Sequence, residues 1–246
     1  MTYTLATEFL RLGFIAIALP ALGANASGAS AGQPAGQPGT RPASEPRPVT
    51  TTQHIDFASG GTIHIEGSYG ILRVEGWDRP EVTVTVTKSL PYGYERKHPD
   101  KAKRRLEGLR VVAERRSATE LGISTTKSSL GIEYEIQVPR NSSLAIRHRA
   151  GYVSVSGVAG DIDATCRRGD LVLRLPQKAS YSIDARTKAG TVASDFPGTF
   201  GVRYLVGQRY THEDPSPSRR IHLRVRFGGV TIQPIWPESE APIASD

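Results

Sequence analysis

The residues of this sequence best suited to chemistry are basic side chains that recur at fixed distances before a series of glycines. Counted back from Gly151, Gly169, Gly190 and Gly228, the fourth and second positions are mostly Arg or Lys. The set is Arg147, Arg149, Arg167, Arg186, Lys188, Arg224 and Arg226. If these segments stack as strands about 4.8 Å apart, the side chains form a ladder. Guanidinium groups bind carboxylate, sulfate and phosphate oxygens through paired hydrogen bonds, so the ladder predicts a site for a repeated anion.

The same pattern also fits a solvated charged face. Asp163 and Asp184 stand six positions before their glycines, on the face that carries the basic residues. Arginines two residues further along could pair with them, and surface ion pairs of that kind are common and weak. The spacing leaves both interpretations open.

A second group of basic residues lies between positions 96 and 116. It comprises Arg96, Lys97, Lys101, Lys103, Arg104, Arg105, Arg110, Arg115 and Arg116. Such a cluster can contact anionic lipid or glycan. Lysines and arginines on a surface helix or an edge strand are more often simply hydrated, and on an edge strand they discourage pairing with another chain. This is the simpler interpretation.

Residues that could support catalysis or bind a metal are poorly arranged. The six histidines show no metal-ligand spacing, and the single cysteine, Cys166, cannot form an internal disulfide. His148, Cys166 and Thr187 all stand three positions before a glycine, where we expect side chains to point inward, the histidine satisfied and the thiol inert. We expect no metal, no cofactor and no enzyme activity. The alternative is a polysaccharide-processing enzyme on a β-helix scaffold that uses Asp161, Asp163 or Asp170 with an arginine.

An internal repeat must position the basic residues. Ile162–Gly169 and Ile183–Gly190 match and lie 21 residues apart, and Leu144–Gly151, Ile221–Gly228 and, more loosely, Ile63–Gly70 fit the same frame. Apolar residues stand seven and five positions before each glycine and two positions after it. In two copies the residue five positions before the glycine is Ala. The frame predicts a strand, a glycine corner with positive φ or close backbone approach, and a second strand. One such coil cannot bury its apolar face alone, so neighbouring coils are expected to stack.

Alternation of polar and apolar residues also predicts strands before the repeats. Period-two positions include Ile63, Ile65, Leu72, Val74, Val82, Val84 and Val86. One helix is predicted over 99–108, capped by Asp100, and further strands near 109–115, 120–126 and 131–138. The predicted fold is all-β: a single-stranded β-solenoid or β-helix-like domain with β-hairpins and one short helix.

The N-terminal region predicts export. An apolar run from Gly13 to Leu22 precedes Ala24-Asn25-Ala26, a cleavage pattern, so residues 1–26 are interpreted as a signal peptide. Residues 27–53 are rich in Gly, Pro, Ala and Ser and predict a disordered linker. The domain is expected over 54–235, followed by a flexible acidic tail at 236–246. No transmembrane span should remain after cleavage, and the destination is the periplasm or the cell surface. Export argues against nucleic acid as partner despite the net charge of +7.

Two segments resemble a known family. Gly76-Trp77-Asp78-Arg79-Pro80-Glu81-Val82 and Ser154-Val155-Ser156-Gly157-Val158-Ala159-Gly160-Asp161-Ile162 are similar to the bacterial putative-adhesin family, and the similarity covers most of 54–235. The resemblance implies a short β-solenoid domain behind an export signal or membrane anchor, and surface binding by analogy. The family supplies no catalytic residues to carry over.

Together these observations predict a non-catalytic exported binding or scaffolding module of the bacterial cell envelope. The expected partner is an anionic polysaccharide or other envelope polymer, or another envelope protein.

If residues 1–26 are a cleaved signal peptide, the mature chain begins near Ser27 and accumulates outside the cytoplasm. N-terminal sequencing of protein from its native host measures this directly. A chain that keeps Met1 in the cytosolic fraction would contradict the prediction.

Overall fold

The computed structural model describes residues 48–90, 97–126, 131–177, 179–203 and 206–235. The predicted signal peptide, most of the predicted linker and the predicted acidic tail lie outside these residues. In the described part, no helix is both long and apolar enough to cross a membrane.

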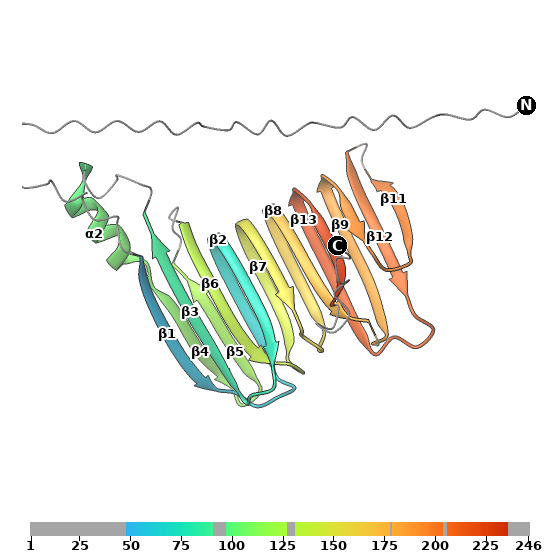
Figure 1. Cartoon of the computed structure of the whole chain (residues 1–246), viewed down its shortest axis with the longest axis horizontal. Helices are drawn as coiled ribbons and strands as arrows, with labels where there is room; N and C mark the ends of the chain where they lie inside the picture. The colour runs from blue at the N-terminus through green and yellow to red at the C-terminus, as the bar shows by residue number, and fades with distance from the viewer. Residues whose placement is uncertain (1–47, 91–96, 127–130, 178, 204–205, 236–246) are drawn as a thin grey trace, which may run out of the picture. The chain divides into compact units, whose positions relative to one another are not determined.

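The described elements are strands and one short helix (Figure 1). In chain order they are β1 (Val49–Asp56), β2 (Thr62–Trp77), β3 (Glu81–Ser89), α2 (Pro99–Gly108), β4 (Val111–Ser117), β5 (Glu120–Thr125), β6 (Gly131–Pro139), β7 (Ser143–Ser156), β8 (Ile162–Pro176), β9 (Tyr181–Ala189), β10 (Val192–Ser194), β11 (Thr199–Arg203), β12 (Gly207–Glu213), β13 (Arg219–Phe227) and β14 (Val230–Ile235). The predicted helix and the three strands after it are confirmed, with small shifts of their ends.

The domain begins earlier than the sequence predicts. Strand β1 starts at Val49, inside the segment that we assign to the linker, and pairs antiparallel with β3 from Val49 opposite Lys88 onward. The boundary at residue 54 is therefore wrong. Thr50, Thr51 and Thr52 give no apolar alternation, but β-branched residues suit an extended edge strand whose order comes from the hydrogen bonds of its neighbour.

The strands form one large mixed β-sheet. Its order is β1-β3-β6-β2-β7-β8-β13-β9-β12-β11, with β5 and β4 attached to β2, and β14 and β10 attached to β8 (Figure 1). The middle of the sheet is parallel, from β2 through β7, β8 and β13 to β9, and antiparallel pairs lie towards both ends.

Stacking does not follow the chain. Strand β13, which carries the last copy of the repeat, lies between β8 and β9. The order of the strands in the sheet therefore differs from their order along the chain. The far edge of β9 is already occupied by β12, which pairs antiparallel with it from Arg209 opposite Arg186 to Glu213 opposite Ser182.

The glycines of the repeat frame are corners. Gly70, Gly151, Gly169, Gly190 and Gly228 have φ between 113° and 134°, as the frame predicts. In β2, β7 and β8 the corner lies inside one long strand. Strand β7 pairs with β2 and β8 on both sides of its corner, whereas β2 exchanges β5 for β6 and β8 exchanges β13 for β14. A Cβ on Gly151 would lie 1.8 Å from the Gly70 carbonyl oxygen, and one on Gly169 would lie 1.9 Å from that of Gly151. The corners therefore stack closer than any side chain allows.

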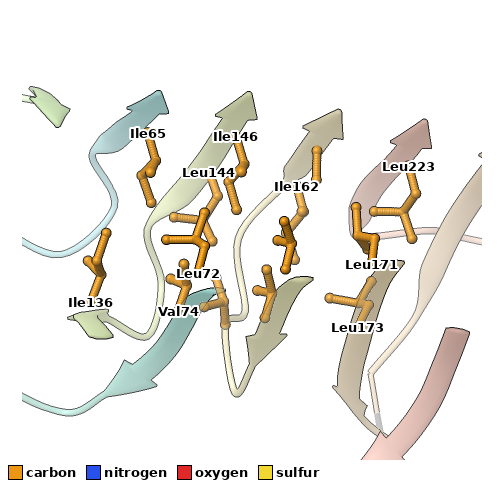
Figure 2. Packing of buried hydrophobic residues seen from close by; sticks show 14 of the residues in the cluster. Ile65, Leu72, Val74, Ile136, Leu144, Ile146, Ile162, Leu171, Leu173 and Leu223 are labelled. Atoms are coloured by element: carbon orange, nitrogen blue, oxygen red, sulfur yellow. The ribbon is translucent and has the colours of Figure 1, made fainter. Parts of the chain in front are cut away.

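The core fills the space between the two halves of each bent strand. In Figure 2, Ile65, Ile146 and Leu223 come from before the corners and point towards Leu72, Leu171 and Leu173 from after them. All the period-two residues named from the sequence are buried, which confirms the alternation. His148, Cys166 and Thr187 are also buried, as predicted from their place before the glycines.

Helix α2 spans the predicted residues with a different cap. Its N-cap is His98, with no side-chain cap, and Asp100 lies in the first turn. Ala102 is buried, and Lys88 Nζ donates to the carbonyl oxygens of Leu106 and Leu109 at the C-terminal end, at 3.3 and 2.6 Å. A cation at that end also suits the helix dipole.

Replacing Gly169 by Ala should destabilise the domain strongly. The new Cβ would occupy a backbone conformation with φ of 113° and collide with the Gly151 carbonyl. We expect a loss of at least about 3 kcal/mol, measured by urea unfolding. Gly201→Ala is the matched control, because nothing lies within 4 Å of a Cβ at that position. Equal stability of the two variants would contradict the role of the corner.

Candidate functional site

The seven predicted ladder residues lie in two columns across the parallel strands. In the first, Arg147 of β7 is opposite Thr165 of β8, which is opposite Arg224 of β13, which is opposite Arg186 of β9. The second column lies two residues further along each strand, where the same register places Arg149, Arg167, Arg226 and Lys188 side by side. The stacking order thus keeps the register that the sequence frame predicts.

At the β13–β9 end, the arginines of the first column lie beside carboxylates. Asp184 accepts hydrogen bonds from Nε of Arg186 at 2.8 Å and from Nε of Arg209 at 3.0 Å. Burial acts to raise the pKa of Asp184, but the hydrogen bonds and charges of these two arginines outweigh it and hold that pKa below its ordinary value. Asp163 lies 3.9 Å from Arg224. The first column at this end fits the interpretation as a self-paired face, whereas Lys188 and Arg226 of the second column have no ion pair among the described residues.

The β7–β8 end is different. Arg147, Arg149 and Arg167 line a pocket of about 400 Å³ together with Glu66, Gly67, Ser68, Thr125, His148 and Thr165. Within the described residues, none of these three arginines has an ion pair. Arg149 lies over the ring of Tyr69, 5.9 Å from its centroid. The pocket therefore carries three cationic forks against one carboxylate.

The sequence prediction missed the β2 side of this pocket. Glu66 is opposite Arg147, and Ser68 stands two residues further along β2, so both occupy ladder positions of the loosely fitting first copy. The frame itself could have found them. No sequence pattern identifies Thr125, because it reaches the pocket only through the pairing of β5 with β2. Its hydroxyl donates to the Glu66 carbonyl at 3.2 Å.

The floor of the pocket is polar and uncharged. His148 Nε2 lies 3.2 Å from the Gly70 carbonyl oxygen, so it acts as the donor, and Nδ1 is buried with no partner in the described structure. Burial lowers the pKa of His148, although the nearby carbonyls of Gly70 and Ala150 oppose the shift. Ser68 Oγ is also buried, next to the Tyr134 hydroxyl. His148 Nδ1 retains unused hydrogen-bonding capacity.

The buried thiol behind this pocket is inert, as expected. Cys166 is fully buried and donates Sγ–H to the Arg168 carbonyl at 3.3 Å. Burial raises the pKa of this thiol, so it stays protonated near neutral pH.

The second basic group spreads over α2, β4 and the segments beside them. Lys101, Lys103 and Arg104 are exposed on α2. Arg115 donates to the Asp56 carbonyl, and Arg116 lies against Gly122. Arg96 falls outside the described residues. Two members therefore have structural roles, in line with the simpler interpretation of this group.

The carboxylates of the enzymatic alternative serve other partners. Asp161 accepts from the backbone N–H of Arg220, and Asp170 from that of Gly229, each at 2.8 Å. These bonds connect the start of β8 to β13, and the residue after the β8 corner to the turn between β13 and β14. No group of three or more His, Cys, Asp or Glu side chains suited to a metal ion occurs in the part of the chain that the structure describes.

Comparisons with known proteins give distant structural neighbours only. No family model matches the sequence. No curated protein matches it either. A crystal structure described as a putative cell adhesion protein from Clostridium sporogenes is 11% identical with a TM-score of 0.49, and the match covers 77% of this chain and 100% of that chain. Structures described as putative adhesins from Parabacteroides distasonis and Bacteroides fragilis are 13% and 12% identical, with TM-scores of 0.25 and 0.24. These two matches cover 75% and 76% of this chain and 70% and 97% of those chains. At these values the function has to be inferred from this chain's own residues.

The burial of His148 predicts a loss of stability in mild acid. Its ordinary pKa is 6.5 and the folded value is lower, so below about pH 6.5 the unfolded chain takes up a proton that the folded chain resists. The free energy of unfolding should fall from about pH 7 to pH 5, and fall less in His148→Gln. Cys166→Ala is the control, since its thiol does not titrate in this range. An unchanged pH dependence in His148→Gln would refute the assignment.

Proposed function

We propose that this protein is a non-catalytic, exported binding module of the bacterial cell envelope that holds an anionic polymer at the pocket of Arg147, Arg149 and Arg167. The observation that carries the proposal is the division of the ladder. Arg186 is hydrogen-bonded to Asp184 and Arg224 lies 3.9 Å from Asp163, whereas Arg147, Arg149 and Arg167 have no ion pair among the described residues and line one pocket. A surface that served only solvation would not need three unpaired arginines to converge on one pocket.

The spacing of the three arginines suits a chain of anions. Arg149 and Arg167 lie on neighbouring strands, about 4.8 Å apart, and Arg147 and Arg149 are two residues apart on one strand, about 7 Å. A polymer that crosses the strands would meet a cationic fork at each step. Paired hydrogen bonds to oxygen anions give such contacts direction as well as charge.

A solenoid-like arrangement of the strands would suit this role. Parallel coils that share glycine corners keep their outer positions in register, and repetitive surfaces of this kind suit extended ligands. The predicted export signal would deliver the module to the periplasm or the cell surface. The structural roles of Asp161 and Asp170 argue against the polysaccharide-processing alternative, because both carboxylates accept backbone hydrogen bonds.

Replacing Arg147, Arg149 and Arg167 together by Ala should weaken binding to an acidic polysaccharide by at least about tenfold, since each contact is a charge-assisted hydrogen bond. Binding by the parent should also weaken as salt rises above about 0.1 M. Affinity electrophoresis or calorimetry against heparin and polygalacturonate measures both effects.

The triple variant Lys101→Ala, Lys103→Ala, Arg104→Ala is the matched control. It removes the same charge from exposed positions of α2 and should leave the affinity nearly unchanged. If the pocket variant binds every polyanion as the parent does, the arginines are solvated surface and the proposal fails.

A further inference from the structure

The pocket of Arg147, Arg149 and Arg167 holds more than cations. Its β2 wall contributes the Glu66 carboxylate and the Ser68 hydroxyl, and Thr125 and Thr165 add two further hydroxyls. We infer that the ligand is a carboxylated glycan, whose sugar units carry an acid group beside free hydroxyls, rather than a polymer densely covered with sulfate or phosphate. This inference rests on the proposed function and names the chemistry of its ligand.

Glu66 is the strongest constraint on the ligand. It is exposed and stands directly opposite Arg147 in the β2–β7 register, yet it forms no ion pair in the described structure. A carboxylate accepts hydrogen bonds and repels anions. A sulfate or phosphate cluster filling the pocket would therefore meet repulsion at its β2 side, whereas a sugar hydroxyl would donate to Glu66.

Ser68 gives an independent observation of the same kind. Its hydroxyl lines the pocket and is buried next to the Tyr134 hydroxyl, with which it interacts. A ligand hydroxyl can both donate to and accept from this pair of hydroxyls, whereas a sulfate or phosphate oxygen can only accept. Thr125 already donates to the Glu66 carbonyl, so it is left to accept from a ligand hydroxyl.

The arrangement matches the two sides of one sugar acid. The arginine forks of β7 and β8 lie on one side of the pocket and the acceptors of β2 on the other, one strand spacing of about 4.8 Å from Arg147 and Arg149. A pyranose ring with a carboxylate spans a comparable distance between its acid group and its hydroxyls.

The test compares two polymers on the same purified protein and its variants. Polygalacturonate supplies carboxylates with hydroxyls, and heparin of similar length supplies dense sulfate. For the parent protein we expect tighter binding per sugar unit to polygalacturonate than to heparin. Glu66→Ala should lower affinity for polygalacturonate about tenfold while leaving heparin unchanged or tighter, and Ser68→Ala should lower the former a few-fold.

The matched control is Glu114→Ala, which removes a carboxylate of the same charge from an exposed position on β4. It should leave the ratio of the two affinities unchanged. Thermal unfolding checks that Glu66→Ala folds, and the affinity ratio removes any common effect of a folding defect.

The outcomes separate the inference from the proposed function. Equal effects of Glu66→Ala on both polymers, or binding of heparin without polygalacturonate, would overturn the carboxylated-glycan inference and leave the anion pocket intact. Binding of neither polymer by the parent, or full binding by the triple arginine variant, would overturn the proposed function itself.

Discussion

The contact between each glycine corner and the carbonyl oxygen of its neighbour is the constraint on which the rest of this structure depends. Five glycines with positive φ form the corners, and a Cβ on any of them except Gly70 would lie 1.8 to 2.1 Å from the carbonyl oxygen of the neighbouring corner. Because the corners stack so closely, the strands before and after them cannot slide independently. The same contact thus sets the register of the core, where Leu72 and Leu171 face inward, and of the outer columns, where Arg147 and Arg167 face solvent.

The corners also leave carbonyl oxygens that the bent strands do not use, and the position three before the glycine supplies their partners. His148 donates to Gly70, Cys166 to Arg168 and Thr187 to Gly190. Three different side chains at the inward-pointing position thus each donate a hydrogen bond to a carbonyl oxygen near a corner. A buried carbonyl without a donor is costly, which accounts for polar residues in a column that otherwise faces an aliphatic core. Because these groups are neutral, the charge of the pocket comes from its rim alone.

Charged residues then make the two ends of the ladder different. Basic residues stand at equivalent positions on β7, β8, β13 and β9, but acidic residues occur six positions before the corner only on β8 and β9. Asp184 is half-buried and accepts hydrogen bonds from Arg186 of the ladder and from Arg209. On β7 the equivalent position is Ala145, and Arg147 has no acid of that kind beside it.

The sequence by itself determined the strand periodicity, the corner glycines, the helix at 99–108 and the outward columns of basic residues, because these depend on local alternation and on φ at single positions. Only the tertiary structure decided the order of the coils, since β13 enters between β8 and β9 once β12 occupies the outer edge of β9. It also decided which arginines are free. Ion pairing depends on which strand lies beside which, and a pocket wall built from β2, β5, β7 and β8 joins segments that the chain separates by up to about a hundred residues. Local patterns carry no record of such distant pairings.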